Sequence, residues 1–196
     1  MVITLLKLII GQTPMDRQTL LFSATFPDDI ALISAQYQHS PERITVSTQV
    51  AQEQIAQIFI RTQRQDKADA LMGLIQSYQP AAAVVFCQTK AAVHDLVVTL
   101  NEKGVDAAGL HGDLEQRERD QVLAQFANRS CAVLVATDVA SRGLDIDQLA
   151  AVINVDITPD PQVHVHRVGR TGRAGAAGLA LSLATLNDMG RVGAIE

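Results

Sequence analysis

The chain has 196 residues, of which 47% are hydrophobic and 19% are charged, and this balance excludes a disordered chain. Lys and Arg number 16 against 21 Asp and Glu, so the net charge of −5 argues against a protein that coats nucleic acid by bulk charge, although a local basic site remains compatible with it. Only 4% of the residues are aromatic and none is Trp, so stacking platforms for single-stranded bases are scarce.

Neither a membrane span nor a disulfide is expected. No apolar run reaches the roughly 18 residues that cross a bilayer. The apolar start at residues 1–10 has no basic stretch before it and no small-residue cleavage site after it, so it does not read as a signal peptide. Cys87 and Cys131 lie far apart without a Cys-x-x-Cys motif, which favours two reduced thiols in a cytoplasmic protein.

The sequence divides into two blocks. Residues 1–46 contain one strand-like run, Thr19–Phe22, between helix-like pieces. Residues 47–54 are polar and predict a linker. Residues 55–196 form a longer and more regular block.

Strands and helices alternate through this second block. Apolar residues at helical spacing predict a helix over 71–78 that Pro80 ends, and another over 93–100 that stops at Gly104. Asp113 and Gln116 form a plausible capping box for a third helix, which runs through Phe126. Short apolar runs predict strands at 55–60, 83–87, 105–110, 132–136, 152–155 and 179–183. This alternation predicts an α/β fold with a parallel sheet that helices cover on both faces.

Ligands of such a sheet bind at the carboxyl ends of its strands. The segments that follow three buried strands carry hydroxyl or glycine residues: Gln88-Thr89-Lys90, His111-Gly112-Asp113, and residues 137–145. Backbone N–H groups at helix N-termini, together with hydroxyls, bind phosphate without many Lys residues. Each turn taken alone is also compatible with ordinary helix capping.

The densest signal is the segment 164–175. Arg167, Arg170 and Arg173 stand three residues apart with no acid between them, and on a helix they would share a face and repel one another. We therefore expect this segment to bind an anion, since the arginine fork suits phosphate oxygens. The alternative is a solvated face or pairing with Asp156 and Asp160. The histidines of this segment, His164 and His166, lack a third ligand at suitable spacing, so no metal site is predicted.

Five motifs in this order resemble the later motifs of DEAD-box RNA helicases: Ser23-Ala24-Thr25-Phe26-Pro27, the run Val84 to Thr89, Gln116-x-x-Arg119, residues 136–145, and His166 to Arg173. The resemblance covers roughly residues 16–190. The stretches at 111–117 and 163–167 look most like the bacterial DbpA subgroup, whose members act on ribosomal RNA.

The resemblance implies roles for individual residues. Arg170 and Arg173 match arginine fingers that reach the γ-phosphate of ATP, and Asp145 matches a contact to the ATP ribose. His166 matches the residue that links this cleft to the coupling motif Ser23-Ala24-Thr25. The positions that match contacts to the sugar–phosphate backbone of RNA are Thr89, Gly112, Arg119 and Thr137.

The sequence departs from the family in two places. It has neither the Gly-rich phosphate loop with its Lys-Ser/Thr nor the Asp-Glu-Ala-Asp box. The resemblance therefore implies a second RecA-like domain of the P-loop NTPase type at 55–196, preceded by a remnant of a first RecA-like domain at 1–46. ATP and Mg²⁺ would be held mainly by a first domain, so we expect no hydrolysis by this chain alone. The expected partners are that domain and RNA, ribosomal RNA in ribosome assembly, and no membrane.

Two other classes of function share parts of this pattern. One is a non-catalytic RecA-like module that binds RNA or protein, and it describes the isolated chain well. The other is a dinucleotide-binding oxidoreductase, which needs Gly-x-Gly-x-x-Gly after a strand. The comparable glycines, Gly169, Gly172 and Gly175, are spaced by three and interleaved with arginine, which disfavours that class.

Overall fold

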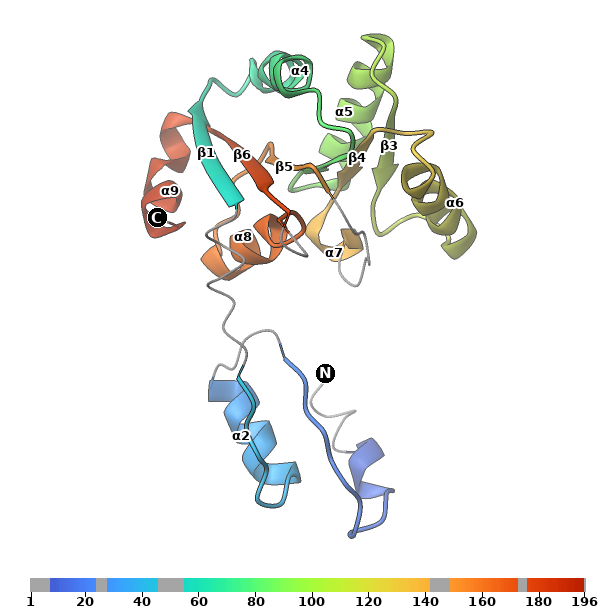
Figure 1. The fold of residues 1–196 in the computed structure, drawn as a ribbon, viewed down its shortest axis with the longest axis vertical. Helices are drawn as coiled ribbons and strands as arrows, with labels where there is room; N and C mark the ends of the chain where they lie inside the picture. The colour runs from blue at the N-terminus through green and yellow to red at the C-terminus, as the bar shows by residue number, and fades with distance from the viewer. Residues whose placement is uncertain (1–7, 24–27, 46–54, 142–148, 173–175, 196) are drawn as a thin grey trace. The chain divides into compact units, whose positions relative to one another are not determined.

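The chain forms two compact units, residues Met1–Val46 and Ser47–Glu196. The computed structural model describes residues 8–23, 28–45, 55–141, 149–172 and 176–195 (Figure 1). Within the described residues, no helix is long and apolar enough to cross a membrane.

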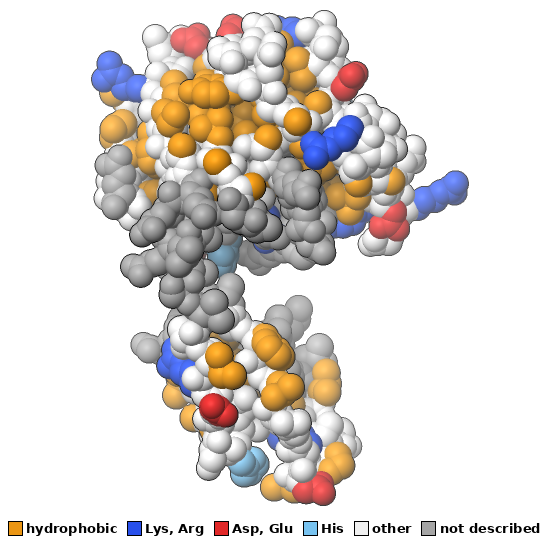
Figure 2. All heavy atoms as spheres, viewed as in Figure 1, with side chains coloured by type: hydrophobic (Ala, Val, Ile, Leu, Met, Phe, Trp, Pro, Cys, Tyr) orange, Lys and Arg blue, Asp and Glu red, His pale blue; other side chains and the backbone are white. Residues whose placement is uncertain are grey.

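The first unit contains a helical turn at residues 8–11 and helix α2 (Asp28–Tyr37). The strand predicted at Thr19–Phe22 is wrong, because that segment forms no ladder with another strand of the described residues. A side-chain amide, Nε2 of Gln38, donates to the Thr19 carbonyl instead (3.0 Å). Leu20 and Phe22 are 68% and 88% exposed, and apolar side chains lie on the visible surface of this unit (Figure 2).

The second unit is a six-stranded sheet with the strand order β1-β6-β5-β2-β4-β3, in which every pair of neighbours is parallel. Its strands are β1 (Ile55–Arg61), β2 (Ala83–Phe86), β3 (Ala107–Leu110), β4 (Val133–Ala136), β5 (Ala151–Asn154) and β6 (Gly178–Ala184). Its helices are α4 (Lys67–Tyr78), α5 (Lys90–Glu102), α6 (Gln116–Ala127), α7 (Asp138–Ser141), α8 (Pro161–Val168) and α9 (Met189–Ile195), with a short 3₁₀ turn at Leu186–Asp188.

Helices cover both faces of this sheet, because alternate residues of a strand point to opposite sides. On one face, Val85 and Ile153 pack with Leu71 of α4 and with the apolar side of α5. On the other face, Val84 and Phe126 belong to a second cluster beneath α6 and α7. The same side continues to α8 (Figure 1). The predicted α/β parallel sheet with helices on both faces is confirmed.

One predicted helix start needs correction. Helix α6 begins at Gln116, and its capping box is formed by Glu115 and Glu118 rather than by Asp113 and Gln116. The Glu118 carboxylate accepts the Glu115 N–H (2.9 Å). Asp113 instead pairs with Lys90 at the start of α5 (2.5 Å), a contact that residue spacing does not reveal.

The arginine-rich segment passes very close to the first residue of β6. A methyl group at Gly178 would lie 2.6 Å from the Gly172 nitrogen and 2.8 Å from Oγ1 of Thr171. The Thr171 hydroxyl donates to the Leu149 carbonyl (2.6 Å), so this segment is fixed from its other side as well. Glycine at 178 therefore permits the approach of two backbones.

We expect Gly178→Ala to lower the free energy of unfolding by about 1–3 kcal/mol, because backbone atoms cannot move aside for the methyl group. The matched control is Gly73→Ala, since Gly73 lies exposed in α4 with nothing within 4 Å of the added carbon. That control should stabilise the helix by about 0.5–1 kcal/mol. Urea unfolding of both variants measures the difference, and a Gly178→Ala chain as stable as the wild type would contradict the argument.

His164 joins α8 to the edge strand β1. Its ring is 3% exposed and stacks on Phe59, with the ring centroids 5.8 Å apart. Its Nε2 lies 3.1 Å from Oε1 of Gln57. Burial, and secondarily the charge of Arg167, lower its pKa from 6.5 to about 4. The folded chain therefore keeps this histidine neutral where an unfolded chain protonates it.

This difference predicts a loss of stability in acid. Between pH 6.5 and 4 the unfolded chain binds a proton at His164 that the folded chain does not. The contribution of His164 to the free energy of unfolding is therefore complete above pH 6.5, and it is lost as the pH drops towards 4. Replacing His164 with Gln should flatten the pH dependence of unfolding over this window. His94→Gln, on the exposed side of α5, should leave it unchanged. Equal slopes for wild type and His164→Gln would refute the assignment.

Candidate functional site

Three of the predicted RNA-contact residues lie at the carboxyl ends of adjacent strands. Thr89 follows β2, Gly112 follows β3 and Thr137 follows β4, which lies between the other two strands. Thr89 and Gly112 are exposed, and Thr137 is half-buried. The fold thus brings together residues that are separated by up to 48 positions in the chain.

Backbone geometry fixes these strand ends. The Thr89 hydroxyl caps α5 by accepting the Ala92 N–H (3.1 Å), which leaves the residue extended. The Thr137 N–H donates to the Leu110 carbonyl (3.2 Å), so the ladder between β3 and β4 extends to the residue after β4. A short strand followed by a helix-capping residue therefore places a hydroxyl group at this end of the sheet.

The fourth predicted RNA contact, Arg119, is already engaged within the protein. It is half-buried on α6, and its Nη2 donates to the Ala140 carbonyl of α7 (2.5 Å). Its guanidinium thus anchors the short helix that follows Thr137. The sequence does not indicate this contact.

Arg167 is the best-connected polar side chain of this region. It is 3% exposed, and its Nε and Nη2 donate to both carboxylate oxygens of Asp138 (2.6 and 2.8 Å). Its Nη1 donates to Oδ1 of Asn154 (3.1 Å) and to the Asp156 carbonyl (2.7 Å). The guanidinium lies 5.0 Å from the Phe86 ring centroid. Such a buried and neutralised cation is not available to a soluble anion.

This finding corrects the expectation that three arginines share one helix face. Helix α8 ends at Val168, so Arg170 lies in the turn beyond it. Arg167 pairs with a carboxylate on α7 and not with the carboxylates of Asp156 or Asp160. The Asp160 carboxylate caps α8 by accepting the Gln162 N–H (2.9 Å).

The sequence contained a signal for this network that was missed. Asn154 is fully buried inside a strand that is covered on both faces, and its amide also donates to the Ser182 hydroxyl (3.0 Å). A buried amide needs hydrogen-bond partners, so its presence in an apolar strand indicates a polar network in the core.

His166 and Arg170 face a common small cavity beside Arg167. His166 is exposed in the last turn of α8, and Arg170 is half-buried. The Arg170 N–H donates to the Arg167 carbonyl (3.1 Å), which continues the turn after the helix. The residues that line this cavity are Phe86, Asp138, Ser141, Val163, His166, Arg167 and Arg170.

Some predicted site residues lie outside the described residues, namely Ala24, Thr25, Asp145 and Arg173. Ser23 is described, exposed, in the first unit. The structure therefore brings together Thr89, Gly112, Thr137, Arg119, His166 and Arg170 along one end of the sheet in the second unit.

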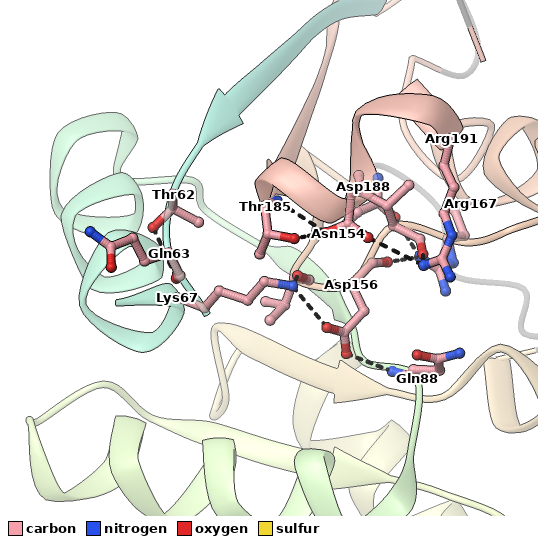
Figure 3. A network of polar contacts seen from close by, with 12 residues as sticks. Thr62, Gln63, Lys67, Gln88, Asn154, Asp156, Arg167, Thr185, Asp188 and Arg191 are labelled. Atoms are coloured by element: carbon pink, nitrogen blue, oxygen red, sulfur yellow. Dashed lines mark hydrogen bonds and ion pairs between the residues drawn. The ribbon is translucent and has the colours of Figure 1, made fainter. Parts of the chain in front are cut away.

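A wide groove lies at the carboxyl ends of β1, β6, β5 and β2, with polar pairs along it (Figure 3). Lys67 forms an ion pair with Asp156 (3.0 Å). Asp188 accepts the hydroxyl of Thr185 (2.6 Å) and pairs with Arg191 (3.2 Å). The charges in these pairs offset one another, so these contacts give the groove no excess of either sign.

Neither nucleophilic nor metal chemistry is indicated here. Cys87 lines the groove, but its burial and the nearby charge of Asp156 raise its pKa to about 12. Cys131 is also a buried free thiol, and burial raises its pKa. Among the residues that the structure describes, no three His, Cys, Asp or Glu side chains are grouped to hold a metal ion.

Comparison with known proteins identifies the family. The family described as Helicase conserved C-terminal domain matches residues 66–175. The ATP-dependent RNA helicase DbpA of Escherichia coli is 49% identical over 96% of this chain, which covers 41% of that protein. The DEAD-box ATP-dependent RNA helicase CshA of Streptococcus pneumoniae is 45% identical over 97% of this chain, which covers 37% of it. The chain thus spans about two fifths of the length of these relatives.

Solved structures agree with these sequence matches. Saccharomyces cerevisiae Dbp5 bound to RNA and ADP BeF₃ has a TM-score of 0.82 and 29% identity, over 95% of this chain and 50% of that one. A DEAD box protein from Methanococcus jannaschii has a TM-score of 0.71 and 32% identity, over 99% of this chain and 52% of that one. The family match spans more than half of the sequence, and the sheet has the RecA-like fold of these structures, so the chain belongs to the DEAD-box RNA helicases and carries their conserved C-terminal helicase domain.

Proposed function

We propose that this chain is the part of an ATP-dependent RNA helicase that holds the RNA backbone and supplies arginine fingers to ATP. The observation that carries the proposal is the shared position of two residue groups at the carboxyl ends of the strands. Thr89, Gly112 and Thr137 lie at three neighbouring strand ends, and His166 and Arg170 face a cavity beside α7. Helix α7 begins directly after Thr137, so one short segment adjoins both groups.

The proposed RNA contacts suit recognition of the backbone. Hydroxyl groups at Thr89 and Thr137 and an exposed backbone at Gly112 offer small donors to phosphate and ribose oxygens. Such contacts follow the shape of a strand and do not select its bases. Arg119, anchored to the Ala140 carbonyl, would hold α7 in place beside the strand. The similar Dbp5 structure is described as bound to RNA, which supports the assignment.

On the nucleotide side, Arg170 and Arg173 would reach the γ-phosphate of ATP, and Asp145 would contact its ribose. ATP and Mg²⁺ would be held mainly by a first RecA-like domain, whose phosphate loop and acidic box this sequence does not contain. His166 would link the cleft to the coupling motif Ser23-Ala24-Thr25 of residues 1–46. The small cavity that His166 and Arg170 share supports placing these two residues together on the nucleotide side.

The proposed substrate is ribosomal RNA in the bacterial cytoplasm, during ribosome assembly. Support comes from the segments at 111–117 and 163–167, which resemble the DbpA subgroup, and from the 49% identity to the E. coli relative. The alternative is a non-catalytic module that binds RNA or protein. The missing phosphate loop and acidic box favour that alternative for this chain acting alone.

The arginine fingers can be tested in a chain joined to the first RecA-like domain of a relative. Arg170→Ala and Arg173→Ala should each lower kcat about 10³-fold or more, because each removes a charge that stabilises the transferring phosphate. Lys at either position should rescue poorly, since an ammonium does not reproduce the planar fork. RNA affinity without nucleotide should change little.

The matched control is Arg129→Ala, because Arg129 bonds the Ala81 carbonyl before β2, at the opposite end of the sheet. Its kcat should equal that of the wild type. Near-normal turnover of both finger variants would refute their assignment. No turnover by the joined protein, with the added domain intact, would favour the non-catalytic module.

Binding of single-stranded RNA by the 196-residue chain should be weak and independent of sequence. Few phosphates are contacted, and mainly by neutral donors, so few counterions are released. The logarithm of the affinity should fall against the logarithm of salt with a slope of magnitude about 1 or less, since a single strand releases about 0.7 counterion per neutralised phosphate and Arg119 is the one cation among the four proposed contacts. Fluorescence anisotropy at several salt concentrations measures the slope. Tight, sequence-specific binding at physiological salt would contradict the proposed backbone contacts.

A further inference from the structure

Asp156 lies two residues beyond the end of β5 and contacts three other parts of the domain (Figure 3). Its Oδ2 accepts the backbone N–H of Gln88 (3.0 Å), and its Oδ1 accepts Nζ of Lys67 (3.0 Å). Its backbone carbonyl accepts Nη1 of Arg167 (2.7 Å). One residue thus joins the turn after β2, the start of α4 and the buried arginine of α8.

The contact to Gln88 sets the position of a turn that is otherwise exposed. Gln88 and Thr89 both face solvent between the end of β2 and the start of α5. The Thr89 hydroxyl accepts the Ala92 N–H and so fixes Thr89 to the helix that follows it. On the other side, the backbone conformation at Thr89 depends on the position of Gln88. A carboxylate on the neighbouring strand end holds that residue by its main chain, independently of the Gln88 side chain.

Lys67 pairs with the other oxygen of this carboxylate. The Lys67 side chain is 13% exposed, and its Nζ also donates to the Val155 carbonyl (2.6 Å). The ammonium is therefore fixed by the backbone next to Asp156, and it neutralises the carboxylate. The charged pair leaves the second carboxylate oxygen for Gln88.

We propose that Asp156 is a positioning residue that holds the Gln88–Thr89 turn in the conformation that contacts the RNA backbone. The proposal rests on the proposed function, because it takes Thr89 as an RNA contact. Asp156 itself touches no RNA, and it acts through the Gln88 N–H. A turn that is fixed before binding loses less conformational entropy when RNA arrives, so this hydrogen bond raises RNA affinity as well as stability.

Three variants of the 196-residue chain separate positioning from stability. Asp156→Ala removes the acceptor of the Gln88 N–H. Asp156→Asn keeps an oxygen for that N–H but loses the charge that faces Lys67. Lys67→Met removes the ion pair but leaves the carboxylate for Gln88, and it serves as the control for stability alone.

Besides the Tm of each variant, two measurements are made under conditions where every chain is folded. The first is the anisotropy of a labelled single-stranded oligoribonucleotide, and the second is the hydrogen-exchange rate of the Gln88 amide. Asp156→Ala should lower RNA affinity about tenfold and raise exchange at Gln88 by about tenfold or more, the loss expected for one charge-assisted hydrogen bond. Asp156→Asn and Lys67→Met should have lower Tm values but stay within about threefold of wild-type affinity.

Two results would overturn the proposal: wild-type RNA affinity for Asp156→Ala, or losses in Asp156→Asn and Lys67→Met as large as that of Asp156→Ala. The second result would show that the affinity follows stability alone. Absence of RNA binding by the wild-type chain would overturn the proposed function instead. The exchange rate of Gln88 then decides by itself whether Asp156 fixes the turn.

Discussion

The ion pair between Arg167 and Asp138 is the contact on which the arrangement of the site depends. Arg167 has five N–H donors, and four of them are used by Asp138, Asn154 and the Asp156 carbonyl. The surroundings are an apolar sheet face and the Phe86 ring, so each charge needs the other. Arg167 is 3% exposed and Asp138 is 30% exposed, so removing Asp138 would leave a buried guanidinium without its compensating charge, whereas removing Arg167 would leave a carboxylate that water reaches.

The short helix α7 owes its position to two arginines on different helices. Arg167 of α8 holds its first residue, Asp138, through the carboxylate, and Arg119 of α6 holds it through the Ala140 carbonyl. A helix of four residues has too few internal hydrogen bonds to be stable alone. The proposed RNA contact Thr137 and the cavity with His166 and Arg170 adjoin this helix, so both proposed binding functions depend on the same two side chains.

Exposed ion pairs contribute to the stability of the domain differently from the pair of Arg167 and Asp138. Lys90 with Asp113 and Lys103 with Asp69 are close pairs whose side chains are 42–76% exposed. Water screens such pairs, so each contributes little to the stability of the domain. Asp156 and Lys67 are intermediate, since Lys67 is 13% exposed while Asp156 is 28% exposed.

Local sequence determined the six strands of the second unit as short apolar runs, and helices α4, α5 and α6 as apolar residues at helical spacing, whereas α7, α8 and α9 were not predicted. The strand expected at 83–87 is observed as β2 (Ala83–Phe86), and the helix expected at 93–100 lies within α5 (Lys90–Glu102). The prediction failed at Thr19–Phe22, where a strand needs a partner strand and the described residues supply none. It also failed for the cap of α6, where Glu115 and Glu118 form the capping box and Asp113 pairs with Lys90 instead.

The sequence by itself also determined which strand ends carry hydroxyl, glycine and arginine residues, and through their motifs it determined the family. Only the tertiary structure decided which charges meet. Asp138 and Asn154 lie 29 and 13 residues from Arg167, and Gln88 lies 68 residues from Asp156, so no periodicity along the chain connects them. The strand order places β5 beside β2 and β2 beside β4, and this order brings those side chains within hydrogen-bond distance. Electrostatic partners depend on distance in space, and a parallel sheet sets that distance by the order of its strands, not by their order in the sequence.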